Sequence, residues 1–202
     1  MLFRSGIGIK CSETVYELPI DEQSRKAVDA ILAREEIDPA NPLIAINPMT
    51  TWKTKHWHNE GFAEVADRLL EKGFTVVFTG GPGDSAAVSN IFSLMRQQAV
   101  NLAGKTDLKT LAALFARCAA VISTDTGPMH IAAATGVPVV ALFGPTAPWR
   151  TGPYGEKHKV VRAGISCRPC FKKQCETMEC MKRIKAEQVL AAINQVFEHK
   201  NT

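Results

Sequence analysis

The sequence predicts an α/β domain built on a doubly wound parallel sheet. From residue 43 onward, short apolar runs alternate with segments whose apolar residues recur at helical spacing. The runs are continuously apolar, which is typical of strands that helices cover on both faces. With 202 residues, 46% of them hydrophobic and 22% charged, the chain is long enough for one large globular domain or a domain with an attached arm.

Residues 1–42 are predicted to form an arm, a linker and one helix ahead of this domain. Residues 1–20 show no clear period and begin without a helix cap, as if cut from a longer chain, so we treat them as a linker. From Asp21, the stretch DEQSRKAVDAILAREEI has helical periodicity, and the prolines that follow close the helix. The domain itself is expected over 43–202.

Strands and helices then alternate along the chain. We expect strands at 43–47, 74–80, 99–104, 119–123 and 137–144. We expect helices at 59–73, 84–98, 107–118 and 127–136. Gly73 ends the first of these helices and Asp107 opens the third. A cysteine-rich loop and a C-terminal helix complete the predicted domain.

Polar segments follow each predicted strand. They are NPMTTWKTKHW, GGPGD, AGKTD, STDTGP and GPTAPWR, and each is rich in Gly, Thr, Pro or charge. In doubly wound folds ligands bind beyond the carboxyl ends of the strands. We therefore expect these segments to share one rim, which is the predicted ligand site.

The segment after the fourth strand has two interpretations. A helix that starts directly from a strand directs the free N–H groups of Gly127 and its neighbours into the cleft, which makes an anion site, most often for phosphate. In the alternative, Asp125 or Thr126 only caps the helix, with Pro128 in its first turn. His130, taken alone, is more typical of a structural residue than of a catalytic one.

The segment after the first strand favours the anion site. Thr50 and Thr51 offer hydroxyl donors, Lys55 adds a positive charge, and Trp57 anchors the loop. A diphosphate needs that combination of neutral donors and a cation. In the alternative the loop is solvated and basic, which fits Lys53 better than Lys55, because the loop of Lys55 must lie near the loop after the fourth strand.

Asp84 follows the glycine turn TGGPGDS after the second strand. The turn lacks the Gly-Lys-Ser/Thr ending of a nucleoside triphosphatase, and it is not a full dinucleotide fingerprint. An acid at this place binds ribose hydroxyls in related folds, or it caps the helix that follows, and both interpretations stay open.

Four segments together resemble one enzyme family. They are NPMTTWKTKHW, VVFTGGPGD, the run from NLAGKTD to TGPYG, and CRPCFKKQCETMECMKRI. In this order, over residues 43–196, they look like the C-terminal half of the ADP-heptose:lipopolysaccharide heptosyltransferases, glycosyltransferase family 9. The resemblance implies a GT-B enzyme, in which two Rossmann-like domains face each other across a cleft and the C-terminal one binds the nucleotide sugar.

The resemblance also implies roles for individual residues, with ADP-heptose as substrate and no cofactor. The residues implied in binding the nucleotide sugar are Thr50, Thr51, Lys55, Asp84, Thr106, Asp125, Thr126, Gly127 and His130. The first three would hold the diphosphate, Asp84 the ribose and Thr106 the adenine, while the last four would contact phosphate and heptose hydroxyls. Lys55 and Asp125 would be catalytic, since a cation at position 55 stabilises the charge that the leaving ADP gains.

This sequence departs from the family pattern in its extent. The family's catalytic base is an acid of the N-terminal domain, and an inverting transfer needs a base. Because only the C-terminal half is present, we expect this chain to bind the donor and to transfer sugar poorly or not at all. The lipopolysaccharide core acceptor would bind through the missing N-terminal domain.

Charge and hydropathy limit the kinds of partner and the cellular location that we expect. The net charge of +4 is modest and spread along the chain, so no nucleic acid is expected. No apolar stretch approaches the roughly 18 residues that span a bilayer, and the N-terminus does not read as a signal peptide. A cytoplasmic location is expected, with peripheral association at the cytoplasmic face of the inner membrane as the resemblance allows.

Four of the six cysteines crowd into CRPCFKKQCETMEC. The C-x2-C spacing of Cys167 and Cys170 allows a tetrahedral zinc site, but the gaps to Cys175 and Cys180 are unlike those of common zinc ribbons. We expect no metal here, and reduced cysteines in a loop over the C-terminal helix, with a disulfide after oxidation.

Two other classes of function stay open. One is a non-catalytic module that binds a nucleotide or nucleotide sugar at the same rim. The other is an unrelated hydrolase with Asp125 as its nucleophile, and the lack of a second acid two residues later argues against it.

Overall fold

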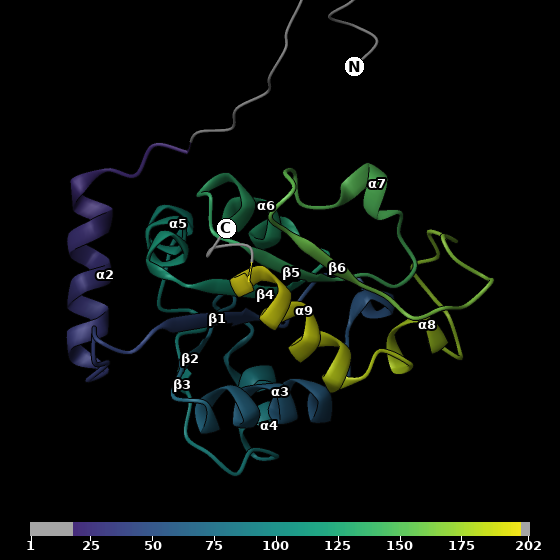
Figure 1. Ribbon diagram of the computed structural model, residues 1–202, viewed down its shortest axis with the longest axis horizontal. Coiled ribbons are helices and arrows are strands. Elements are labelled where there is room, and N and C mark those ends of the chain that lie inside the picture. The colour runs from purple at the N-terminus through teal and green to yellow at the C-terminus, as the bar shows by residue number, and fades with distance from the viewer. Residues whose placement is uncertain (1–17, 199–202) are drawn as a thin grey trace, which may run out of the picture.

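The computed structural model describes residues 18–198, in which helices cover both faces of a six-stranded sheet (Figure 1). The strands are β1 (Leu43–Asn47), β2 (Thr75–Phe78), β3 (Val100–Asn101), β4 (Ala120–Thr124), β5 (Val139–Leu142) and β6 (Lys159–Val161). Their order is β3-β2-β1-β4-β5-β6, and every neighbouring pair is parallel. This is the strand order of the Rossmann-like doubly wound fold, so the predicted fold class is confirmed.

The helices flank the sheet in the predicted alternation. They are α2 (Glu22–Arg34), α3 (Asn59–Glu71), α4 (Ser85–Phe92), α5 (Leu108–Arg117), α6 (Gly127–Ala134), α7 (Pro148–Thr151), α8 (Glu179–Lys182) and α9 (Ala186–Glu198), with a 3-10 turn, η1, at Lys53–Lys55. Asp107 caps α5 as predicted, because its carboxylate accepts from the amide of Thr110 at 2.7 Å. Residues 1–17 of the predicted linker lie outside the described residues.

Helix α4 ends at Phe92, before the predicted residue 98, for a tertiary reason. The buried carboxylate of Asp67, on α3, accepts from the amides of Arg96 and Gln97 at 2.9 to 3.1 Å. Because these two amides donate to Asp67, they do not form the hydrogen bonds to backbone carbonyls that would continue the helix. Strand β6 and the short helices α7 and α8 were not expected from the sequence.

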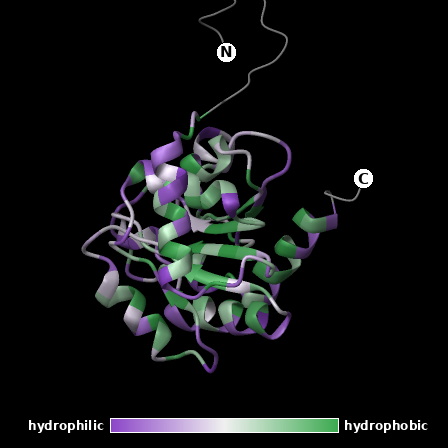
Figure 2. Ribbon diagram, turned by 90° about the vertical axis from the view of Figure 1, so that its left-hand side faces the viewer, coloured by the Kyte–Doolittle hydropathy of each residue, from purple (hydrophilic) through white to green (hydrophobic). Residues whose placement is uncertain are grey.

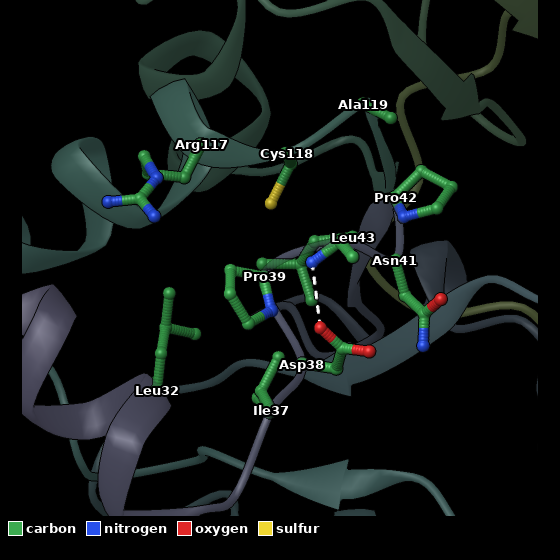
Figure 3. A pocket seen from close by; sticks show the side chains of 11 residues that line it. Leu32, Ile37, Asp38, Pro39, Asn41, Pro42, Leu43, Arg117, Cys118 and Ala119 are labelled. Carbon is green, nitrogen blue, oxygen red and sulfur yellow. Dashed lines mark hydrogen bonds between the residues drawn. The ribbon is translucent and has the colours of Figure 1, made fainter.

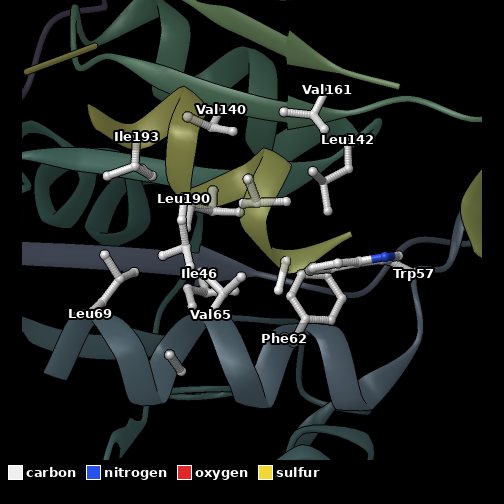
Figure 4. Packing of buried hydrophobic residues seen from close by; sticks show 14 of the residues in the cluster. Ile46, Trp57, Phe62, Val65, Leu69, Val140, Leu142, Val161, Leu190 and Ile193 are labelled. Atoms are coloured by element: carbon white, nitrogen blue, oxygen red, sulfur yellow. The ribbon is translucent and has the colours of Figure 1, made fainter. Parts of the chain in front are cut away.

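The sheet divides the apolar core into two clusters. Successive side chains of a strand point to opposite faces, so Ile44 and Ile46 pack toward α3, α4 and α9, whereas Leu43 and Ala45 pack toward α2, α5 and α6. Figure 4 shows the first cluster, where residues of α3 and α9 meet those of the central strands. The strands are hydrophobic between helices that carry hydrophilic residues (Figure 2), as burial on both faces requires.

Helix α2 contributes to this core, although the sequence placed it ahead of the domain. Val28 is 1% exposed and belongs to the second cluster with residues of α5. The boundary before Leu43 stays a prediction. Within residues 18–198, every helix is too short or too polar to span a bilayer.

Candidate functional site

The strand order reverses between β1 and β4. Strands β2 and β3 are added on one side of β1, and β5 and β6 on the far side of β4, so the connections leave these two central strands toward opposite faces. A crevice opens at the carboxyl ends of the strands at such a reversal, and it is where ligands bind in open α/β sheets. The loops that border it here are residues 48–58, after β1, and 125–127, after β4.

Lys55 and Asp125 meet at this crevice. The ammonium Nζ of Lys55 lies 2.7 Å from Asp125 Oδ2 and donates to the Asp125 carbonyl oxygen at 3.3 Å. The two side chains are 14% and 5% exposed. Thr146, which follows β5, donates its hydroxyl to the same Oδ2 at 2.5 Å. Loops from three strands thus hold a cation and an anion together, and the predicted nearness of the first two loops is confirmed.

The loop of Lys55 is fixed on both sides of this residue. Trp57 is buried, and its indole N–H donates to the carbonyl oxygen of Ile184 at 3.1 Å, so the predicted anchor is confirmed. Thr54 is buried as well, and its hydroxyl donates to the carbonyl oxygen of Lys172 at 2.9 Å. Lys55 therefore projects from a loop whose backbone has little freedom.

The Lys55 ammonium lies beside an aromatic ring of its own loop. Nζ lies 4.6 Å from the centroid of the Trp52 ring, a favourable cation–π distance. Thr50 is half-buried, and its carbonyl oxygen is 2.6 Å from Nε2 of His56. Thr51 is exposed. Lys53 is exposed too, so the solvated alternative fits this lysine, whereas Lys55 is only partly exposed.

The N-terminal end of α6 carries no side-chain cap. Thr126 occupies the cap position, but its side chain makes no capping hydrogen bond, and Pro128 stands in the first turn. The carboxylate of Asp125 is engaged by Lys55 and Thr146, so the alternative in which Asp125 or Thr126 caps the helix through its side chain is wrong. An ideal Cβ on Gly127 would meet nothing within 4 Å, so open space adjoins the positive end of the helix.

The remaining predicted residues lie at the same edge without a described contact to Lys55 or Asp125. Asp84 closes the glycine turn, because its carboxylate accepts from the amide of Gly81 at 2.7 Å and makes no capping bond to α4. Asp84 thus stands at the N-cap position of α4, as the capping alternative expected, but its side chain does not cap the helix. Thr106 is half-buried after β3. His130 is exposed on α6 and lines a cavity of about 290 Å³ together with Arg150.

The cysteine-rich loop, residues 167–178, adjoins the loop of Thr146. The amide of Cys170 donates to the carbonyl oxygen of Pro145 at 2.9 Å. All cysteines of the described region are free, and no three His, Cys, Asp or Glu side chains in that region are grouped so as to hold a metal ion. Burial, together with the neighbouring thiols, raises the pKa of Cys180, whereas a hydrogen bond from the Met178 amide lowers the pKa of Cys175.

A second cavity, of about 350 Å³, lies at the opposite edge of the sheet (Figure 3). It adjoins Leu43, the first residue of β1. Its two charged side chains are engaged: Asp38 accepts from the amide of Ala40 at 2.9 Å, and Arg117 pairs with a carboxylate of α2 at 2.6 Å. Burial raises the pKa of Cys118 to about 12, so this thiol is neutral. In this cavity no charged side chain is left to bind a ligand, whereas the crevice has the Lys55 ammonium beside the uncapped end of α6.

Thr146 and Trp52 are residues of the crevice that the sequence did not single out. Thr146 lies in GPTAPWR, which was placed on the rim, but one threonine among many gives no signal of its own. Trp52 directly follows Thr50 and Thr51, which the sequence analysis did identify. The signal that could have identified Trp52 is an aromatic residue close to lysines in the sequence, a pattern that allows a cation–π contact.

The chain is similar to known proteins over most of its length. The model of glycosyltransferase family 9 (heptosyltransferase) matches residues 1–181. Lipopolysaccharide heptosyltransferase 1 of Pseudomonas aeruginosa is 35% identical over 174 residues, which cover 86% of this chain and 46% of that protein. Lipooligosaccharide heptosyltransferase 2 of Campylobacter jejuni is 31% identical over 166 residues, 79% of this chain and 52% of that one. The chain spans about half the length of these curated relatives.

Two solved structures share the fold. The glycosyl transferase family 9 protein from Veillonella parvula superposes with a TM-score of 0.84 at 28% identity, over 96% of this chain and 57% of that one. The ADP-heptose lipopolysaccharide heptosyltransferase II of Escherichia coli superposes with a TM-score of 0.78 at 27% identity, over 92% and 54%. The expected likeness to half of a GT-B glycosyltransferase is thereby confirmed.

Proposed function

We propose, because the chain belongs to glycosyltransferase family 9, the heptosyltransferase family, that this domain binds ADP-heptose as the donor for inverting transfer of heptose to the lipopolysaccharide inner core. One observation carries the proposal. Lys55, Asp125 and the uncapped N-terminal end of α6 converge at the crevice between β1 and β4. A diphosphate and a sugar need these groups side by side.

The diphosphate would bind between Lys55 and the start of α6. An ammonium has three N–H donors, and the structure directs two of them to Asp125, so one is available to a phosphate oxygen. The free N–H groups of Thr126, Gly127 and their neighbours supply the neutral donors, with the helix dipole behind them. Thr50 and Thr51 add hydroxyl donors from the facing loop.

The rest of the donor would extend along the same edge of the sheet. Asp84, at the end of β2, would accept from the ribose hydroxyls, and Thr106, after β3, would lie along the adenine. Asp125 and His130 would face the heptose hydroxyls. When the glycosidic bond breaks, negative charge develops on ADP, and the cation of Lys55 stabilises it in a partly dehydrated place.

The acceptor would come from the half of the enzyme that this chain does not match. Inverting transfer requires a base that takes the proton of the acceptor hydroxyl, and the family resemblance assigns it to an N-terminal domain. We therefore infer that this chain alone binds donor, and that transfer to lipopolysaccharide, at the cytoplasmic face of the inner membrane, requires the partner domain.

Calorimetric titration of the chain with ADP, UDP and ADP-heptose tests the proposal. ADP is expected to bind more tightly than UDP, and ADP-heptose more tightly than ADP. Lys55→Ala is expected to lose binding of both adenine ligands. Lys53→Ala is the matched control, because it removes an equal charge from the same turn at an exposed position. Equal losses in both variants would indicate nonspecific charge attraction.

Two other outcomes support other functions. Binding of ADP and ADP-heptose with equal affinity would favour a nucleotide-binding module that is indifferent to the sugar. Release of phosphate that Asp125→Asn abolishes would favour a hydrolase, although the engagement of Asp125 Oδ2 by Lys55 and Thr146 makes this carboxylate a poor nucleophile.

A further inference from the structure

We propose that Thr146 is a positioning residue of this site, which orients the Asp125 carboxylate so that its second oxygen, Oδ1, receives a hydroxyl group of the donor sugar. The inference rests on the proposed function and deepens it, because it assigns sugar recognition, separately from nucleotide recognition, to a contact between two loops.

The contact between Thr146 and Asp125 is short and shielded from water. The hydroxyl Oγ1 lies 2.5 Å from Oδ2, and the two residues are 5% and 4% exposed. A carboxylate only accepts hydrogen bonds, so the single proton of the threonine hydroxyl is directed to Asp125. Hydrogen bonds of this kind, to a charged acceptor in a place of low dielectric constant, are among the strongest in proteins.

Both contacts of the Asp125 carboxylate converge on one oxygen. Lys55 Nζ and Thr146 Oγ1 each approach Oδ2, and no group in residues 18–198 donates to Oδ1. In that part of the chain the buried side-chain polar atom without a hydrogen bond is Arg168 Nε, so Oδ1 is not sealed in the core. An accessible acceptor beside the diphosphate position fits a sugar hydroxyl, which is a donor.

Thr146 is itself held in place by its neighbours. The carbonyl oxygen of Pro145 accepts from the amides of Cys170 and Phe171, each at 2.9 Å. Gly144 packs so closely under α8 that an ideal Cβ would lie 2.4 Å from the sulfur of Met181. The cysteine-rich loop and α8 therefore clamp the segment 144–146, and the hydroxyl of Thr146 cannot follow the carboxylate if that group rotates.

The consequence concerns specificity. Without the hydroxyl, Lys55 alone holds the carboxylate, which is then free to rotate and to turn either oxygen toward the ammonium. The sugar hydroxyl then loses a fixed acceptor. ADP does not reach Asp125 Oδ1 in the proposed arrangement, so its affinity depends on Lys55 and α6 and changes little.

The test compares ADP with ADP-heptose, by calorimetry on the full chain, in three variants of position 146. Thr146→Val keeps the shape and removes the hydroxyl, Thr146→Ala removes it without placing a methyl group against the carboxylate, and Thr146→Ser keeps it. Valine and alanine are expected to lower the ratio of ADP-heptose affinity to ADP affinity about tenfold, while serine keeps the ratio within about twofold of the unmodified chain.

A purely structural role would lower both affinities together and leave the ratio unchanged, and this result overturns the inference. An equal fall of the ratio in Thr146→Ser overturns it too, because the hydroxyl would then not be the cause. Circular dichroism of each variant confirms folding, and the alanine variant decides the matter if the valine variant does not fold. An unmodified chain that binds no adenine nucleotide refutes the proposed function itself, whatever position 146 does.

Discussion

Lys55→Ala is expected to weaken the fold as well as donor binding. Asp125 is 4% exposed, and its Oδ2 lies 2.7 Å from the ammonium that the substitution removes. Breaking a buried ion pair by deleting one partner costs about 3–5 kcal/mol, because the remaining charge is left uncompensated. We expect a loss near the lower end, about 3 kcal/mol, since the Thr146 hydroxyl still binds the carboxylate and Lys55 is 14% exposed.

Urea unfolding followed by tryptophan fluorescence measures this loss, because Trp57 is buried in the core. Adding Asp125→Asn to Lys55→Ala removes the stranded charge, so the double variant is expected to regain about 2 kcal/mol over Lys55→Ala. Lys53→Ala, at an exposed position, is expected to change the free energy of unfolding by less than about 0.5 kcal/mol. Equal unfolding midpoints for Lys55→Ala and Lys53→Ala would refute a buried pairing of Lys55 with Asp125.

Two further predictions concern other parts of the molecule. The pKa of exposed Cys175 is lowered by the hydrogen bond from the Met178 amide, and that of buried Cys118 is raised to about 12, so iodoacetamide at pH 7.5 is expected to modify Cys175 first. Its rate should fall as the pH drops through the lowered pKa, and peptide mapping that finds equal rates at both cysteines contradicts this. Asp67→Ala is expected to cost about 2–4 kcal/mol in urea unfolding, because the buried carboxylate accepts two backbone amides, and a change below about 0.5 kcal/mol refutes that role.

The sequence predicts those parts of the fold that depend on local pattern. The run LIAIN is apolar up to its last residue, Asn47, and β1 occupies the same residues, because a central strand is buried on both faces. Asp107 opens α5 as a cap, for which the amino-acid type alone is a strong signal. Strand β6 has three residues, one of them buried, so its pattern is too short to recognise.

Contacts between distant segments set the limits of this prediction. The early end of α4 depends on the carboxylate of Asp67, 29 residues from Arg96 in the sequence. The nearness of Lys55 and Asp125 was predictable, because the carboxyl ends of parallel strands meet at one edge. Their direct pairing, and the contact of Thr146 with the same oxygen, depend on side-chain geometry that no spacing in the sequence encodes.

The central claim is that a diphosphate binds between Lys55 and the start of α6. The most direct measurement is a titration of the uniformly nitrogen-15-labelled chain with ADP-heptose, followed by the amide resonance of Gly127 in nitrogen–proton correlation spectra. The account predicts a saturable shift of that resonance, which Lys55→Ala abolishes at the same ligand concentration. A silent Gly127 resonance, with shifts confined to residues around the cavity at Leu43 and Cys118, would contradict it.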